Sequence, residues 1–293
     1  MKIRIKDYPD GTSYAQIELG NDNFTYKINS YEDLWKLGQI LEAANYNHIK
    51  PNVTIPNLID AQADKRFDIM QSSGLSMVCK FLNSFDAHYR IFHPHNAEVT
   101  EALLNNVTII DNHKFIMFVL WSIYKEDKAV YPSIKIDYLH QSSLGYNYSS
   151  RLKDNLILMS TDAGGYKPLM KLCEDLNWQG EVVSASKARE FKDGKSILTQ
   201  VISQTDFKGK DILLIDDICV YGGTFKGLAK LLRERNCGKL YLAVSHMTVQ
   251  NLGINPVTDY FDQVFTTNSK FDEYYTGIQN PQLLKDLNII KLF

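Results

Sequence analysis

The sequence has little that would support a disulfide framework or a structural zinc site. Its 293 residues include only four cysteines, which are widely spread and form no C-x-x-C pair: Cys79, Cys173, Cys219 and Cys237. Structural zinc sites and disulfide scaffolds both need clustered or regularly spaced cysteines. Scattered cysteines are typical of a reducing compartment, so we expect a cytoplasmic protein without disulfides.

A strong net charge and a long apolar run are also missing. The 32 basic and 34 acidic residues give a formal net charge of -2, which favours neither a nucleic-acid nor a membrane partner. No apolar run approaches the roughly 20 residues of a membrane-spanning helix. The opening stretch MKIRIKDYPDG lacks the apolar core of a signal peptide. Any phosphate binding must therefore come from a local site.

The apolar residues that are present, 44% of the chain, predict an α/β protein of about two domains. Short apolar runs alternate with helical patterns, which is typical of parallel sheets covered by helices. Strands are predicted at 3–6, 12–19, 24–28, 52–57, 89–93, 155–160, 181–186, 211–216 and 239–246. Helices are predicted at 31–46, 67–85, 113–127, 164–176 and 225–236, and a mobile loop at 187–210.

The polar stretch 140–150 lacks periodicity and predicts the domain junction. We therefore expect domains at 1–140 and 141–293, each built on a mainly parallel sheet flanked by helices. Ligands of such sheets bind at the carboxyl ends of the strands.

The stretch DILLIDDICVYGGTFKGLAKLL, residues 211–232, carries the sharpest signal. A Gly-Gly turn between a strand and a helix directs backbone N–H groups into one concavity, and the helix N-terminus adds positive potential. Thr224 is expected to N-cap the helix or to donate its hydroxyl to a phosphate oxygen. Asp216 and Asp217 lie too close to that pocket to bind phosphate, so their expected partners are hydroxyls or magnesium. A ribose phosphate offers both groups, whereas the alternative is a solvated acidic pair before a structural turn.

These residues resemble the ribose-phosphate motif of the type I phosphoribosyltransferase fold. Further stretches resemble the ribose-phosphate diphosphokinases, or PRPP synthetases. STDAGGYKPLMKL (160–172) is similar to their pyrophosphate-side loop, with Thr161 in place of a proline, and SASKARE (184–190) to the start of their catalytic loop. YPDGTSYAQI (8–17) resembles the adenine-contacting hairpin, IPNLIDAQADKRF (55–67) the ATP-site stretch, and HPHN (93–96) the segment of the metal-linked histidine. The resemblance covers nearly the whole chain in the family's order, although the family's N-terminal strand–helix unit is expected to be missing.

The resemblance implies transfer of the terminal diphosphate of ATP to the anomeric hydroxyl of ribose 5-phosphate, with Mg²⁺ as cofactor. It implies Lys187 and Arg189 as catalytic cations, and His95 and Asp162 on the metal side. The implied substrate-binding residues are Asp162, Gly164, Gly165, Asp216, Asp217, Tyr221, Gly222, Gly223 and Thr224. The implied ATP-binding residues are Tyr8, Asp10, Gln62, Asp64, Lys65, Arg66 and His95. Zinc bound by His93 and His95 is an alternative, but a third ligand at suitable spacing is not evident. A homodimer or larger homo-oligomer is implied, since the family's hairpin reaches a neighbouring subunit.

Several positions depart from the family pattern. Val220 and Tyr221 replace an Asp-Thr pair, Ala188 replaces an arginine, Thr12 replaces a glutamate, and residues 62–63 replace an Arg-Gln pair. A bulky aromatic beside the 5-phosphate pocket favours a sugar with an additional group, and ADP-ribose supplies an adenine on which Tyr221 could stack. Ribose 5-phosphate and ADP-ribose both stay open as acceptors. A PRPP-consuming phosphoribosyltransferase and a non-catalytic regulatory homologue are the alternative functions.

Overall fold

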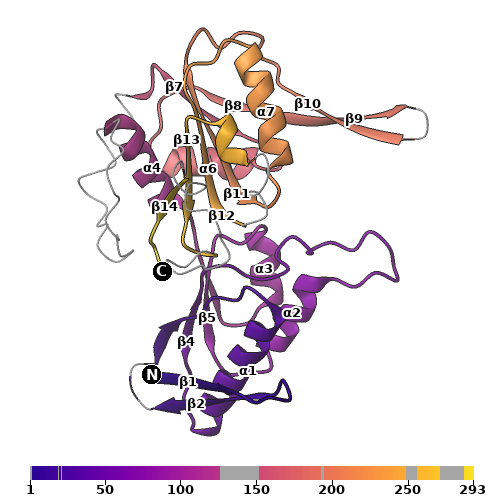
Figure 1. Ribbon diagram of the computed structural model, residues 1–293, viewed down its shortest axis with the longest axis vertical. Helices are drawn as coiled ribbons and strands as arrows, with labels where there is room; N and C mark the ends of the chain where they lie inside the picture. Colours follow the sequence, from indigo (N-terminus) through magenta and orange to yellow (C-terminus); the bar gives the residue numbers. More distant parts are fainter. Residues whose placement is uncertain are drawn as a thin grey trace. The chain divides into compact units, whose positions relative to one another are not determined.

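The computed structural model describes residues 2–18, 20, 22–125, 152–192, 195–248, 256–270 and 287–293, excluding the side chains of 187–199. It forms two compact units, Met1–Asn112 with Phe293 (unit 1) and His113–Leu292 (unit 2) (Figure 1). The predicted junction at 140–150 lies outside the described residues, so the domains 1–140 and 141–293 stay a prediction. Each unit contains one main parallel sheet with helices, as predicted.

Unit 1 is built on a four-stranded parallel sheet in the order β3-β4-β5-β6. Its strands are β3 (Asn23–Thr25), β4 (Asn52–Ile55), β5 (His88–Phe92) and β6 (Val107–Ile110), and its helices are α1 (Tyr31–Tyr46), α2 (Gly74–Leu82) and α3 (Ala97–Leu103). An antiparallel hairpin of β1 (Lys2–Asp7) and β2 (Ser13–Glu18) lies beside α1, where the Gln39 side chain bonds the Ser13 carbonyl at 2.6 Å. The apolar faces of α1 and α2 are buried with β4 and β5 in one core, because their leucines recur at helical spacing.

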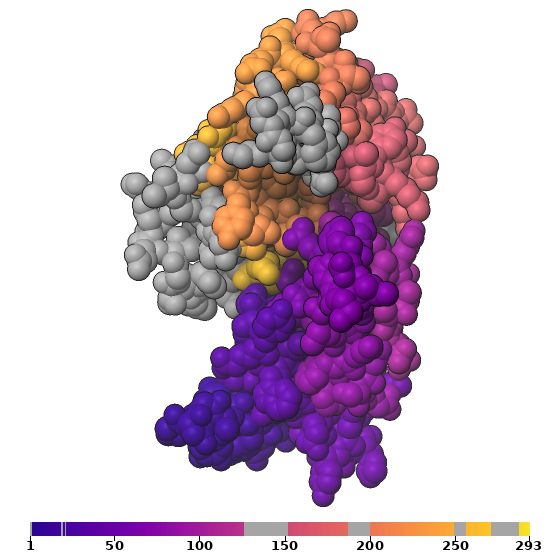
Figure 2. Space-filling view, turned by 90° about the vertical axis from the view of Figure 1, so that its right-hand side faces the viewer, coloured from indigo at the N-terminus to yellow at the C-terminus, as the bar shows by residue number. Residues whose placement is uncertain are grey.

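The second helix is shorter than predicted. α2 begins at Gly74 instead of residue 67, because Ser73 N-caps it by accepting the Ser76 N–H. Before it, the Asp68 carboxylate accepts the Met70 N–H at 2.8 Å and the Gln71 side chain accepts the Phe67 N–H at 2.9 Å. Such local bonds compete with helix formation. Figure 2 faces the side on which this loop projects in Figure 1, and purple atoms of this part of the chain lie uncovered at the front.

Unit 2 is built on a six-stranded parallel sheet in the order β14-β13-β12-β11-β7-β8. Its strands are β7 (Leu156–Ser160), β8 (Val182–Ser184), β11 (Asp211–Cys219), β12 (Leu240–Met247), β13 (Gln263–Thr267) and β14 (Leu287–Ile290). Its helices are α4 (His113–Lys125), α6 (Tyr166–Asp175), α7 (Gly223–Glu234) and the short η3 (Val257–Tyr260). Every residue of β7 and β12 is buried, as expected for parallel strands covered on both faces.

A separate antiparallel hairpin replaces much of the predicted mobile loop at 187–210. It consists of β9 (Ser186–Lys192) and β10 (Lys195–Val201), and it projects beyond α7 (Figure 1). The lysines of this segment favour an exposed loop, but they do not prevent strand pairing. The alternating Ile197, Thr199 and Val201 are β-branched residues that favour a strand. Among the described residues, no helix is both long and apolar enough to span a bilayer.

Candidate functional site

The acidic pair lies within a strand and not at its end. β11 was predicted to end at Asp216 but continues to Cys219, because Ile218 and Cys219 still pair with β12 opposite His246 and Met247. The added apolar residues extend the parallel ladder past the carboxylates. Asp216 and Asp217 therefore have half-buried side chains near the carboxyl end of the strand.

Asp216 is held from two sides. The hydroxyl of Thr161, the residue after β7, donates a hydrogen bond to Asp216 Oδ2, and the Asp217 N–H donates to Asp216 Oδ1 at 2.9 Å. Burial, and then the negative charge of Asp217, raise the pKa of Asp216 well above its usual range, whereas the Thr161 hydrogen bond opposes the rise. A cation or sugar hydroxyls at this position would stabilise the charged form.

The glycine turn forms the N-terminus of α7. Gly222 is the N-cap residue with φ of 74°, a left-handed conformation that favours glycine. Within the described part of the chain, no side chain caps α7, so the expectation that Thr224 is the N-cap is wrong. Thr224 lies in the first helical turn because the left-handed residue precedes it. The first N–H groups of a helix have no acceptor within the helix, which leaves them available to an anion.

The loop between β11 and α7 is braced by Thr248. Its N–H donates to the Cys219 carbonyl at 3.0 Å and its hydroxyl donates to the Val220 carbonyl at 2.9 Å. Tyr221, the next residue, has 71% of its surface exposed. The backbone of the turn is thus fixed while the aromatic ring lies uncovered next to Gly222.

A second loop follows β7. Asp162 Oδ1 accepts the Gly165 N–H at 3.0 Å, and Gly165 is the N-cap of α6, so the predicted helix start at the glycine pair is confirmed. The Ser160 hydroxyl donates to the Asp162 carbonyl at 3.0 Å and lies 2.9 Å from the Ser184 hydroxyl at the end of β8. The predicted Asp162, Gly164 and Gly165 therefore form one ordered turn linked to β8.

The predicted catalytic residues lie on the hairpin, whose base contacts the first turn of α7. Lys187 and Arg189 lie on β9 opposite Gln200 and Leu198 of β10. The structure does not describe the side chains of these two residues, so their catalytic roles stay predictions. The Gln200 side chain donates to the Thr224 carbonyl at 2.8 Å. This bond connects the hairpin base to the Thr224 turn. The bond between Thr161 and Asp216 in turn connects β11, the strand before that turn, to the β7 loop.

The predicted adenine contacts lie on the turn of the unit 1 hairpin. Tyr8 is partly exposed, with Lys6 Nζ 5.5 Å from its ring centroid. Asp10 Oδ1 accepts the Thr12 N–H at 3.0 Å and the Thr12 hydroxyl at 2.7 Å. These bonds lower the pKa of Asp10. Thr12 thus stabilises the charged Asp10 carboxylate within the turn.

The other predicted ATP-site residues follow two neighbouring strands of unit 1. The loop after β4 carries Gln62, Asp64, Lys65 and Arg66, and the loop after β5 carries His95. The Asn96 side chain donates to Asp64 Oδ2 at 3.1 Å, which joins the two loops. His95 and Asp162 belong to different units, so their shared metal role stays a prediction. Among the described residues, no group of three His, Cys, Asp or Glu side chains is arranged to hold a metal ion.

Comparisons with known proteins find similar proteins among phosphoribosyl transferases and ribose-phosphate pyrophosphokinases. Residues 143–278 match the phosphoribosyl transferase domain family. A ribose-phosphate pyrophosphokinase of Thermococcus kodakarensis is 21% identical over 92% of this chain and 86% of its own length. That of Chlorobaculum tepidum is 29% identical over 48% of this chain and 43% of its own length. A crystal structure of phosphoribosylpyrophosphate synthetase from Mycobacterium smegmatis, 14% identical, superposes with a TM-score of 0.72 and covers 99% of this chain and 86% of that chain.

The chain is a distant homologue of the ribose-phosphate pyrophosphokinases, or PRPP synthetases. Its two units have the two-domain fold of such a synthetase, with one four-stranded and one six-stranded parallel sheet. The identity of 21–29% to the two pyrophosphokinases makes it a distant homologue.

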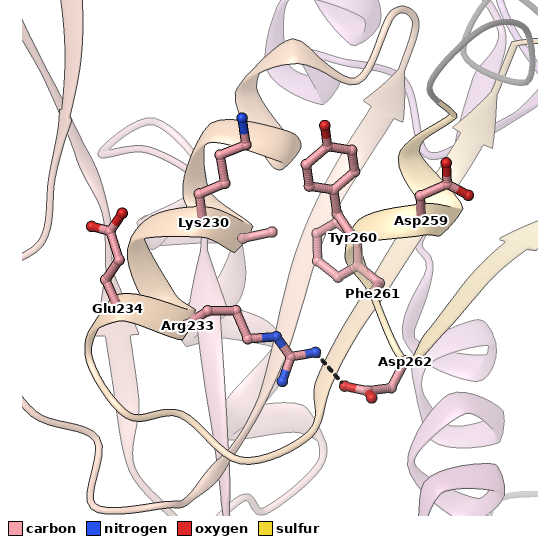
Figure 3. Close-up of a pocket in the computed structure, with 8 residues that line it drawn as sticks. Lys230, Arg233, Glu234, Asp259, Tyr260, Phe261 and Asp262 are labelled. Carbon is pink, nitrogen blue, oxygen red and sulfur yellow. Dashed lines mark hydrogen bonds and ion pairs between the residues drawn. The ribbon is translucent and has the colours of Figure 1, made fainter.

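This divergent synthetase homologue also has a hollow away from the predicted site. It has a volume of about 480 Å³ and lies between the last turns of α7 and η3, at the opposite end of α7 from the glycine turn (Figure 3). Tyr260 forms one wall under Lys230, and Arg233 pairs with Asp262 at 2.6 Å. None of the residues predicted for the site lines this hollow.

Two contacts of the site were not predicted from the sequence. The bond of Thr161 to Asp216 had a visible signal, because a threonine stands where the family has proline and proline cannot donate. The bond of Gln200 to Thr224 had none, because the two residues come from separate elements within a segment interpreted as a mobile loop.

Proposed function

We propose that the protein is an ATP-dependent diphosphokinase that transfers the β,γ-diphosphate of ATP to the anomeric hydroxyl of a 5-phosphorylated ribose and releases AMP. The observation that carries this proposal is the hydrogen bond from Thr161 to Asp216. It joins the loop assigned to the diphosphate with the strand assigned to the sugar. Transfer needs the donor phosphate and the acceptor hydroxyl held next to each other.

The sugar phosphate would be held by the β11 strand and the turn after it. The N–H groups at the start of α7, from Gly223 and Thr224, would donate to the 5-phosphate. Asp216 and Asp217 would accept hydrogen bonds from the 2- and 3-hydroxyls. The two interactions together fix the anomeric hydroxyl relative to the sheet edge.

The diphosphate would be held by the turn from Asp162 to Gly165. Lys187 and Arg189 would neutralise charge on the transferred and leaving oxygens, Lys187 as a point charge and Arg189 through paired contacts. On the ATP side, Tyr8 would stack on adenine, and the residues Gln62, Asp64, Lys65, Arg66 and His95 would line the phosphates. Ala188 leaves this member with one cation fewer than the family pattern.

Magnesium fits the carboxylates that this site offers. Mg²⁺ is usually held by one or two carboxylates together with substrate phosphates, so a cage of protein ligands is not required. Asp162 would supply a carboxylate ligand, with His95 as a candidate from unit 1. Bound Mg²⁺ supplies charge neutralisation between adjacent phosphate oxygens.

The acceptor is either ribose 5-phosphate or ADP-ribose. The exposed ring of Tyr221, adjacent to the proposed phosphate turn, favours an acceptor that carries an aromatic group beyond the 5-phosphate, since an uncovered ring can stack on adenine. ADP-ribose would give ADP-ribose pyrophosphate as product. Ribose 5-phosphate would give PRPP.

Product analysis tests the reaction. The protein is mixed with Mg-ATP and either ribose 5-phosphate or ADP-ribose, and the products are identified by mass spectrometry. The proposal expects AMP only when an acceptor is present, together with an acceptor heavier by one diphosphate. A PRPP-consuming phosphoribosyltransferase would instead release diphosphate from PRPP when a base is added. A regulatory homologue would bind nucleotide and form neither product.

Self-association is proposed for the same protein, with a second copy as the partner. Phe67, Ile69 and Met70 on the loop before α2 are 87–93% exposed. Large apolar side chains of this kind form the centres of protein interfaces, which bury about 800 Å² per partner. We expect sedimentation velocity to show a dimer or larger oligomer for the wild type. Met70→Glu should weaken this association, whereas Tyr46→Glu, at the far end of α1, should leave it intact. A monomeric wild-type protein would refute this proposal.

A further inference from the structure

Gln200 makes a contact between two elements that the sequence gives no reason to connect. It lies on β10, and its Nε2 donates to the carbonyl oxygen of Thr224 in the first turn of α7 at 2.8 Å. A carbonyl oxygen has two lone pairs, so Thr224 accepts this bond without losing its helical one. The hairpin base is therefore bonded directly to the turn that follows the acidic strand.

Gly227 makes room for that contact. A Cβ atom built on Gly227 would lie 2.7 Å from Gln200 Oε1 and 3.5 Å from Gln200 Cδ. Such a distance is too short for any Cβ, so a larger residue would displace the Gln200 side chain. Glycine inside a helix costs about 0.5–1 kcal/mol relative to alanine. Gly227 therefore lowers the stability of α7 at the position where the Gln200 side chain packs against the helix.

The register of the hairpin carries the contact to Lys187. Gln200 and Lys187 are directly opposite each other in the β9–β10 pairing, and opposed Cα atoms in antiparallel strands are about 5 Å apart. Lys187 is thus connected to Thr224 in two steps: the strand pairing between Lys187 and Gln200, and the hydrogen bond from Gln200 to Thr224. Without the Gln200–Thr224 bond, the hairpin base and the Lys187 backbone on it would be less restrained relative to the start of α7.

We propose that Gln200, seated against Gly227, is a positioning residue that sets Lys187 relative to the phosphate-binding turn. The catalytic part of this inference rests on the proposed function, since it takes Lys187 as the transferring cation and the α7 turn as the phosphate site. Gln200 touches no reacting atom. Its effect is on the turnover number, because a displacement of about 1 Å in a catalytic group reduces rates by up to about a hundredfold.

The pair offers a double-mutant test. Gln200→Ala and Gly227→Ala are each expected to lower kcat about tenfold or more, with KM for the acceptor changed much less. In the Gln200→Ala background, Gly227→Ala should cause no further loss of kcat and should raise Tm, because alanine is the better helix former. Equal losses of kcat from Gly227→Ala with and without Gln200 would overturn the proposal.

Two further variants separate positioning from general damage. Gln200→Glu keeps the length of the side chain but cannot donate to the Thr224 carbonyl, so it should resemble Gln200→Ala. Gln204→Ala is the matched control, since Gln204 lies four residues further along and its side chain donates only to the nearby Asp206 carbonyl at 3.3 Å. Gln204→Ala should retain wild-type kcat. Loss in the control as large as in Gln200→Ala would contradict the assignment to Gln200.

Hydrogen exchange provides a measurement that does not depend on turnover. Amide exchange in β9 should be about tenfold faster in Gln200→Ala and Gly227→Ala than in the wild type, because the hairpin base opens more often. If the wild type forms no product with either acceptor, the proposed function fails while the exchange result still decides whether Gln200 holds the hairpin. Unchanged β9 exchange in both variants would overturn the positioning role, whatever the activity.

Discussion

Thr161, the residue after β7, donates a hydrogen bond from its hydroxyl to Asp216 within the neighbouring strand β11. The parallel pairing of β7 with β11 runs up to Ser160 and Ile215, the residues just before Thr161 and Asp216. The bond links the loop that starts at Asp162 to the acidic pair, and it partly offsets the rise in the pKa of Asp216.

Replacing Thr161 by valine should raise the pKa of Asp216 further. Valine keeps the shape but removes the donor, and leaving a buried acceptor without its partner costs about 1–3 kcal/mol. Binding of the ribose phosphate, which needs the charged carboxylate, should shift to higher pH. Calorimetric titrations across a pH series measure the shift. Thr161→Ser keeps the hydroxyl and serves as control, and identical pH profiles for valine and wild type would refute the assigned coupling.

Asp216 should make stability depend on pH. Its pKa is raised in the folded protein, so the folded state binds that proton more tightly than the unfolded chain. The free energy of unfolding of the wild type should therefore fall relative to that of Asp216→Asn as the pH rises. The fall should begin near the usual pKa of a carboxyl group and end above the raised pKa of Asp216. Denaturant unfolding at several pH values measures the difference. Asp217→Asn removes the neighbouring charge and should reduce the loss, whereas parallel curves for wild type and Asp216→Asn would contradict this account.

The two glycines of the turn should respond differently to alanine. Gly222→Ala forces a side chain into a left-handed conformation with Val257 Cβ 3.2 Å from the new Cβ, and should lower the free energy of unfolding by about 1–3 kcal/mol. Gly223→Ala meets no atom within 4 Å and should leave stability nearly unchanged. Thermal unfolding of the two variants tests the difference. Equal destabilisation would show that the turn is not built as described.

Tyr221→Thr should change acceptor preference without changing stability, since the ring is largely exposed. If Tyr221 stacks on the adenine of ADP-ribose, the variant should lose about 0.5–1.5 kcal/mol of binding to it and keep its binding to ribose 5-phosphate. The ratio of kcat/KM for the two acceptors measures the shift. An unchanged ratio would leave ribose 5-phosphate as the simpler acceptor.

Much of the fold could be predicted from the sequence, because periodicity reports local burial. The helix at 31–46 was predicted to the residue, and the glycine pair before α6 correctly marked its start. The hairpin at Ser186–Val201 was not predicted, because the lysines of the segment favour an exposed loop and its strand pairing depends on contacts between β9 and β10. The late start of α2 was missed because Asp68 and Ser73 redirect the backbone through local hydrogen bonds.

The candidate site was only partly predictable. Motif order predicted the residues of both loops, and the parallel sheet places these loops after two neighbouring strands, β7 and β11. The contacts of Gln200 with Thr224 and Gly227 join β10 to α7. These elements meet only after the chain has folded, so no local sequence pattern predicts the contacts. The Thr224 cap was wrong because the left-handed Gly222 already begins the helix.

The most direct test of the account is AMP release from Mg-ATP, measured with and without a 5-phosphorylated ribose, in the wild type and in Lys187→Ala. The account predicts AMP from the wild type only when the acceptor is present, and none from Lys187→Ala, which should still bind ATP. Acceptor-independent AMP, or turnover by Lys187→Ala near the wild-type rate, would contradict it.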